Sequence, residues 1–176
     1  TKKLTLSAFF LALGLVLPMV TGQIPRIGNL LLPMHLPVFL CGLICGGPWG
    51  MAVGLVTPLL RSVMFGMPPL FPTAVSMSCE LAVYGLVCGV IYARAPRQGT
   101  AAVYAALLPA MLAGRAVWGC VQAVLLGMSG SALTLQMFWA SAFLNAIPGI
   151  VLQLVLIPAV MAALNRAGAV RYRQRA

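Results

Sequence analysis

Long apolar stretches, separated by short polar or proline-rich connections, make up most of the chain. They run from about Leu4 to Met19, Leu30 to Arg61, Pro72 to Ala93, Ala101 to Gly127 and Leu135 to Leu164. A helix rising 1.5 Å per residue needs about 20 apolar residues to cross a bilayer, and the glycine-rich residues 46–50 divide the second stretch in two. The pattern therefore predicts an all-α integral membrane protein of about six transmembrane helices, forming one domain over residues 1–176.

The second apolar stretch is the least regular. Its first part, residues 30–47, is short and contains Pro33 and Pro37, so it could be a tilted short helix or a re-entrant segment. In both alternatives the chain returns to the outer side of the membrane at Arg61. Gly42, Gly46, Gly50 and Gly54 recur every four residues, a spacing that allows close contact between helix backbones.

A proline-rich turn follows Arg61. Gly66, Pro68, Pro69 and Pro72 fall within seven residues, and proline lacks the N–H that a helix interior requires. This segment is expected to be a loop that covers a cavity at the outer end of the bundle.

Composition supports the membrane assignment and disfavours enzymatic functions. Hydrophobic residues make up 62% of the 176 residues, charged residues only 7%, and the mean hydropathy is +1.05. With one acidic residue, one His and five scattered Cys, the chain is poorly supplied for a carboxylate dyad, a nucleophile with its base, or a metal site. We expect no catalytic residues, no metal and no cofactor.

The net charge of +10 is explained by its placement rather than by nucleic-acid binding. Basic residues gather before the first apolar stretch, between the third and fourth, and after the last. They are Lys2, Lys3, Arg94, Arg97, Arg166, Arg171, Arg173 and Arg175. Because cytoplasmic loops of membrane proteins are enriched in Lys and Arg, both termini are predicted to be cytoplasmic.

Polar side chains recur on the apolar helices, where they must face protein, water or a ligand. One stripe is formed by Thr73, Ser76, Glu80 and Tyr84, a second by Arg115, Trp118 and Gln122, and a third by Ser141, Asn145 and Gly149. Glu80, Asn145 and Arg61 are expected about 10–17 Å from the outer ends of their helices, with Arg115 at a similar level. Convergence there predicts an outward-opening small-molecule site. The candidate substrate-binding residues are Arg26, Arg61, Glu80, Tyr84, Arg115, Trp118, Gln122 and Asn145.

Several alternatives stay open from the residues alone. Glu80 could pair with an arginine for architecture only, and Arg61 could contact the ligand or simply neutralise Glu80. His35 is a secondary candidate, as a structural histidine or a proton relay. Ala8 and Ala12, spaced i, i+4, could pack inside the bundle or form a docking face for a partner subunit.

The chain resembles the substrate-binding S component of energy-coupling factor (ECF) transporters, which capture vitamins in many bacteria. The resemblance covers nearly the whole chain: A-x-x-x-A at Ala8 and Ala12, and the segments at residues 34–46 (M-H-L-P-V-F-L-C-G-L-I-C-G), 61–74 (R-S-V-M-F-G-M-P-P-L-F-P-T-A) and 145–153 (N-A-I-P-G-I-V-L-Q). It implies a bundle in a bacterial cell membrane, in contact with lipid, that binds its substrate from outside. Ala8 and Ala12 would then face a transmembrane coupling subunit driven by two cytoplasmic ATPases.

The expected substrate is an anionic vitamin-like molecule. Arg26, Arg61 and Arg115 outnumber Glu80 in the outer half, which favours a carboxylate. Among the vitamins that such transporters carry, pantothenate is favoured over riboflavin, folate and lipoate. The rival hypothesis is a free-standing proton-coupled secondary transporter using Glu80 and His35, and a membrane-embedded enzyme or scaffold is a weaker one.

Overall fold

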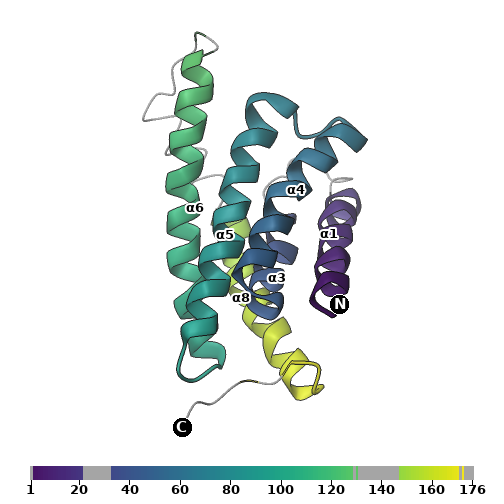
Figure 1. Cartoon of the computed structure of the whole chain (residues 1–176), viewed down its shortest axis with the longest axis vertical. Coiled ribbons are helices and arrows are strands. Elements are labelled where there is room, and N and C mark those ends of the chain that lie inside the picture. Colours follow the sequence, from purple (N-terminus) through teal and green to yellow (C-terminus); the bar gives the residue numbers. More distant parts are fainter. Residues whose placement is uncertain (1, 22–32, 129, 131–146, 171, 173–176) are drawn as a thin grey trace.

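The computed structural model describes residues 2–21, 33–128, 130, 147–170 and 172, and these residues are helical almost throughout (Figure 1). The α-helices are α1 (Lys2–Thr21), α3 (His35–Cys45), α4 (Gly47–Phe65), α5 (Val75–Arg94), α6 (Thr100–Met128) and α8 (Ile147–Arg166), and a short π-helical turn, η1 (Leu70–Ala74), precedes α5. Residues 2–20, 70–94, 100–128 and 147–166 are long and apolar enough to cross a membrane. The prediction of an all-α membrane protein is confirmed.

The basic regions lie together at one end of the bundle. Figure 1 places the start of α1, the connection from α5 to α6 and the end of α8 at its lower end, with η1 at the upper end. Lys2, Lys3, Arg94, Arg97 and Arg166 therefore share what we call the basic end, whereas Arg171, Arg173 and Arg175 lie outside the described residues. This grouping is what a charge bias toward one side of a membrane requires.

Helix α3 is a short helix enclosed by the rest of the bundle. Its 11 residues rise about 16 Å, roughly half the thickness of the hydrocarbon core, and nine of them are buried. It packs on α1, α4, α5 and α8. Because α3 alone is too short to cross a membrane, its first residue, His35, lies inside the bundle.

Glycines bring the backbones of α3, α4 and α5 into contact, as the four-residue repeat predicted. A Cβ atom added at Gly42 would lie 2.5 Å from the carbonyl oxygen of Gly85, and one added at Gly50 would lie 2.9 Å from the same oxygen. A Cβ at Gly54 would overlap the backbone of Leu81. Only glycine permits helices to approach so closely.

Gly46 is the exception within that repeat. It separates α3 from α4 with φ +104°, and a Cβ added there would meet nothing within 4 Å. Its role is conformational, because L-residues with a side chain rarely adopt that backbone geometry.

Helix α4 extends further than the sequence predicted. It continues about one turn beyond Arg61 to Phe65 and ends at Gly66, whose φ of +70° is left-handed. Residues 66–69 are not helical, and Phe71 inside η1 keeps an extended backbone (φ −120°, ψ 135°), so the predicted break before the next helix is present. Pro72, predicted at the boundary between the turn and that helix, lies in η1, and Arg61 lies within α4.

Candidate functional site

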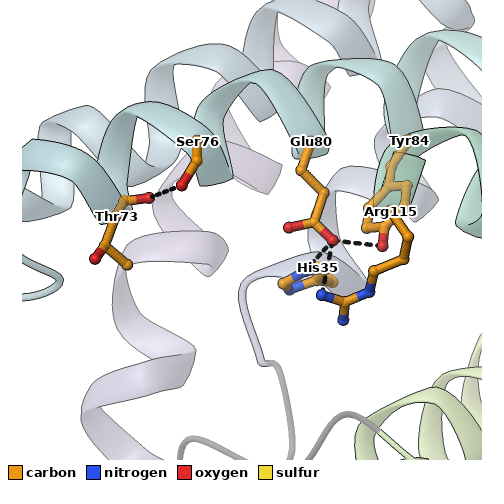
Figure 2. A network of polar contacts seen from close by, with 6 residues as sticks. All are labelled: His35, Thr73, Ser76, Glu80, Tyr84 and Arg115. Carbon is orange, nitrogen blue, oxygen red and sulfur yellow. Dashed lines mark hydrogen bonds and ion pairs between the residues drawn. The ribbon is translucent and has the colours of Figure 1, made fainter. Parts of the chain in front are cut away.

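A buried polar cluster surrounds Glu80, the only acidic residue of the chain (Figure 2). The hydroxyl of Tyr84 donates a hydrogen bond to Glu80 Oε1 at 2.6 Å, and Arg115 Nη1 lies 3.1 Å from the same oxygen. His35 Nε2 is 3.9 Å from it, beyond hydrogen-bond length. Three helices, α3, α5 and α6, thus bring their polar groups to one carboxylate oxygen.

Helical spacing and one glycine explain this geometry. Glu80 and Tyr84 are four residues apart on α5 and therefore share a face. A Cβ added at Gly114 of α6 would overlap the ring of Tyr84. Because Gly114 has no side chain, α6 approaches α5 closely enough for the next residue, Arg115, to reach Glu80.

Tyr84 is held by aromatic packing. Its ring stacks on Phe39 with centroids 4.9 Å apart and lies 5.5 Å from the ring of His35. The residue is only 2% exposed. Tyr84 is thus held against α3 by two rings and in turn donates its hydrogen bond to the Glu80 carboxylate. Its contacts are with the protein.

The charges of Glu80 and Arg115 balance each other, but some polar atoms beside the pair have no hydrogen-bond partner among the described residues. Glu80 and Arg115 are both buried and opposite in charge. Arg115 Nε and both ring nitrogens of His35 are buried and have no hydrogen-bond partner among the described residues. Unpaired buried polar groups are costly, so these atoms need partners from beyond the described residues.

Arg61 lies in a different environment from Arg115. Its Nη1 donates to the carbonyl oxygen of Leu15 in α1 at 2.9 Å, and its guanidinium lies 5.5 Å from the ring centroid of Phe65. From sequence, Arg61 is a candidate partner of Glu80, but in the structure Glu80 pairs with Arg115 instead. Arg61 connects α4 to α1.

The remaining predicted site residues lie on α6 or fall outside the described residues. Trp118 and Gln122 are half-buried, one and two turns beyond Arg115 on α6, and Gln122 Oε1 has no partner among the described residues. Ser76 donates its hydroxyl to the carbonyl of Thr73 at 3.0 Å, so this part of the α5 stripe is satisfied locally. Arg26 and Asn145 lie outside the described residues.

Two further residues belong beside the predicted set. His35, a secondary candidate from sequence, is a member of the cluster. Gln153 of α8 is 2% exposed, and its Nε2 has no partner in the described part of the chain. The sequence did carry a signal for Gln153, since an amide in an apolar helix must find a polar environment.

Ala8 and Ala12 face outward. Both are exposed on α1, while Ser7, Phe10 and Gly14 form its buried face. The interpretation that this pair packs inside its own bundle is therefore not supported by the described structure. The pair stays available to a partner or to lipid.

Comparison with known proteins identifies the family. A family model described as "ECF transporter, substrate-specific component" matches residues 2–161, and no curated protein matches the chain. Proteins of this family are substrate-binding, non-catalytic membrane subunits of transporters. The resemblance inferred from the three sequence segments is thereby confirmed. The chain belongs to the family of substrate-specific components of ECF transporters.

Proposed function

We propose that this chain, as a single transmembrane domain, binds a vitamin-like small molecule from outside a bacterial cell and delivers it across the plasma membrane together with an ATP-driven ECF module. The observation that carries the proposal is the incomplete polar cluster around Glu80. His35 and Arg115 keep unpartnered polar atoms in the bundle interior, about 20 Å from the basic end. A buried, polar, unsatisfied site of this kind is suited to a small molecule.

Pantothenate is the first substrate to test, ahead of riboflavin, folate and lipoate. The contacts change the reason for this choice. Arg61 is engaged by the Leu15 carbonyl and Arg115 by Glu80, so a surplus of positive charge is no longer the main support. Pantothenate also offers an amide and two hydroxyls, which can accept hydrogen bonds from a guanidinium that still has free N–H groups.

The proposed roles of the site residues follow from their contacts. Arg115 contacts the substrate, and Trp118 and Gln122 extend the site along the same helix. Glu80 and Tyr84 orient Arg115. Arg26 and Asn145 complete the proposed site from segments outside the described residues.

The partners are a transmembrane coupling subunit and two cytoplasmic ATPases. Ala8 and Ala12 are the proposed docking face, because small exposed residues at i, i+4 let a second helix approach closely. With the basic end at the cytoplasm, the polar cluster opens toward the outside.

The deciding experiment combines ligand identification with uptake. The purified chain is analysed by native mass spectrometry for a co-purifying molecule, and uptake of that molecule is measured in cells with and without the coupling subunit and ATPases. We expect a bound vitamin and uptake only with the complete module. Uptake that persists without the module and is abolished by an uncoupler would instead establish the secondary transporter. The structural observation in favour of that alternative is the distance of 3.9 Å between His35 Nε2 and Glu80 Oε1.

Docking is tested separately with Ala8→Trp and Ala12→Trp. Each should leave substrate affinity unchanged and abolish energised uptake, because the indole blocks close helix contact. Ala105→Trp, at an exposed alanine of α6, is the matched control and should retain uptake. Lost affinity in the α1 variants would show that these positions support the fold instead.

A further inference from the structure

The unpartnered buried polar atoms of the described chain fall into two groups. Tyr92 and Tyr172 are near the basic end, and their hydroxyls make up the first group. The second contains His35, Arg115, Gln122 and Gln153, and within it three residues are more than nine-tenths buried: His35 at 1% exposed, Arg115 at 7% and Gln153 at 2%. These three are enclosed most completely and therefore have the greatest need of a partner.

Counted along their helices from the basic end, Arg115 on α6 and Gln153 on α8 each lie about 20 Å from the helix end. His35 Nε2 lies 3.9 Å from Glu80 Oε1, the oxygen that pairs with Arg115. Helix α8 packs on α3 and α6, the helices that carry His35 and Arg115. Because Gln153 is buried, its amide faces the interior to which those helices contribute.

The free atoms are mainly hydrogen-bond donors. Arg115 Nε carries one hydrogen, Gln153 Nε2 carries two, and neither can accept a bond. The imidazole of His35 offers at least one N–H donor. The partner that these atoms lack within the described part of the chain is therefore one that presents acceptor atoms.

Charge restricts the acceptor further. Glu80 already supplies the negative charge that Arg115 requires, at 3.1 Å. A carboxylate placed beside the same guanidinium would be close to Glu80, and like charges that share a buried site disfavour each other's ionised forms. An uncharged oxygen or nitrogen acceptor would meet the free donors without that repulsion.

We propose, resting on the proposed function, that Arg115, Gln153 and His35 form the inner end of the substrate site and recognise an uncharged acceptor group of the substrate: an amide or ketone carbonyl, a hydroxyl oxygen or a ring nitrogen. Any carboxylate of the substrate is held elsewhere. Gln153 thereby becomes a residue that determines specificity.

The first test uses Gln153→Leu, a replacement of similar size without polar atoms. Two quantities are measured in detergent: the thermal unfolding midpoint of the substrate-free protein, and the Kd for pantothenate and for riboflavin. The midpoint should stay equal or rise, because an unpaired buried amide is removed, while Kd for the vitamin that binds should rise about tenfold or more. Opposite effects on stability and affinity are the signature of a group whose partner is the substrate.

Thr57→Val is the matched control. Thr57 is also fully buried, but its hydroxyl already donates to the Val53 carbonyl at 2.6 Å. This variant should leave Kd unchanged. If Gln153→Leu lowers the midpoint and leaves Kd unchanged, Gln153 is structural and the proposal is overturned.

The second test compares pantothenate with its carboxamide analogue. If the inner end binds a neutral acceptor, Gln153→Leu should weaken the acid and its amide by the same factor within about threefold, whatever amidation itself does to Kd. Loss of about a hundredfold or more on amidation, with Gln153→Leu affecting only the acid, would mean that this end reads the carboxylate.

Failure of the two proposals can be told apart. If pantothenate, riboflavin, folate and lipoate all fail to bind the wild-type chain, the proposed vitamin function is overturned. The thermal unfolding measurement still tests the inference in that case. A fall in the unfolding midpoint of Gln153→Leu would show that the Gln153 amide is hydrogen-bonded by the protein, and the inference would be overturned. If one vitamin binds and only the amidation result is contrary, the function stands and the inference falls.

Discussion

Two regions of the bundle treat polar groups in opposite ways. In the first, which we call the scaffold seam, α4 packs on α5 through Gly50, Gly54 and Gly85 and on α1 through Thr57 and Gly14. Its polar side chains have backbone partners: the buried Thr57 donates to Val53 and the half-buried Arg61 donates to Leu15. In the second, the polar interior of His35, Glu80, Tyr84, Arg115 and Gln153, several atoms have no partner among the described residues.

The contrast separates structure from binding. Polar groups in a membrane bundle must be satisfied, and the scaffold seam does this with backbone carbonyls. In the polar interior some of these atoms have no partner among the described residues. We therefore assign Arg61 a role in the fold and propose that Arg115 contacts the substrate.

The scaffold seam should fail most severely when its glycines are filled. A side chain at Gly85 would overlap the backbone of Gly50, and backbone cannot move aside as a flexible side chain can. Gly85→Leu should cost more than the ~1–3 kcal/mol usual for overpacking and leave little folded monomer in size-exclusion chromatography. Gly99→Leu, where an added Cβ meets nothing within 4 Å, should elute as the wild type does. A folded Gly85→Leu monomer would show that the seam is not closely packed.

The polar interior should lose both stability and binding when its ion pair is broken. Arg115→Leu leaves Glu80 buried without its cation, at a cost of about 3–5 kcal/mol. The double variant Glu80→Gln with Arg115→Leu should recover most of the unfolding midpoint, since Gln can still accept the hydrogen bond from Tyr84, but not the affinity for substrate. Recovery of both would mean that Arg115 has an architectural role only.

Gly114 tests how the polar interior is positioned. In Gly114→Ala the added methyl would overlap the Tyr84 ring, which also stacks on Phe39. Overpacking should cost about 1–3 kcal/mol and weaken substrate binding by displacing the donor to Glu80. Gly127→Ala, on the same helix with open space around it, is the control for thermal unfolding and Kd. Equal behaviour of the two variants would contradict the close approach at Gly114.

The smallest effect is expected at Arg61. Arg61→Leu removes one hydrogen bond to a backbone carbonyl and one cation–π contact, worth about 1–2 kcal/mol together, because both lie between α1 and α4. Affinity for substrate should change by less than about threefold. A tenfold rise in Kd would place Arg61 in the site and remove the distinction between the two regions.

Much of this organisation follows from local sequence. The glycine repeat predicted close helix contact, and the i, i+4 spacing put Glu80 and Tyr84 on one face. An arginine partner for Glu80 was among the alternatives from sequence, and the structure shows that this arginine is Arg115, at 3.1 Å. Sequence spacing could not tell that Tyr84 packs on Phe39 and His35, since those residues come from a helix about 45 to 50 positions earlier.

The class of protein, the grouping of its basic residues and the family can be read from the chain, because hydropathy, charge placement and short motifs are local properties. Helix packing was needed to show which arginine binds Leu15 and which binds Glu80, that α3 is a short buried helix, and that Gln153 is enclosed without a partner among the described residues. This is so because a polar side chain in a membrane bundle takes the nearest available partner. The nearest partner is set by helix packing, which glycines such as Gly114 control.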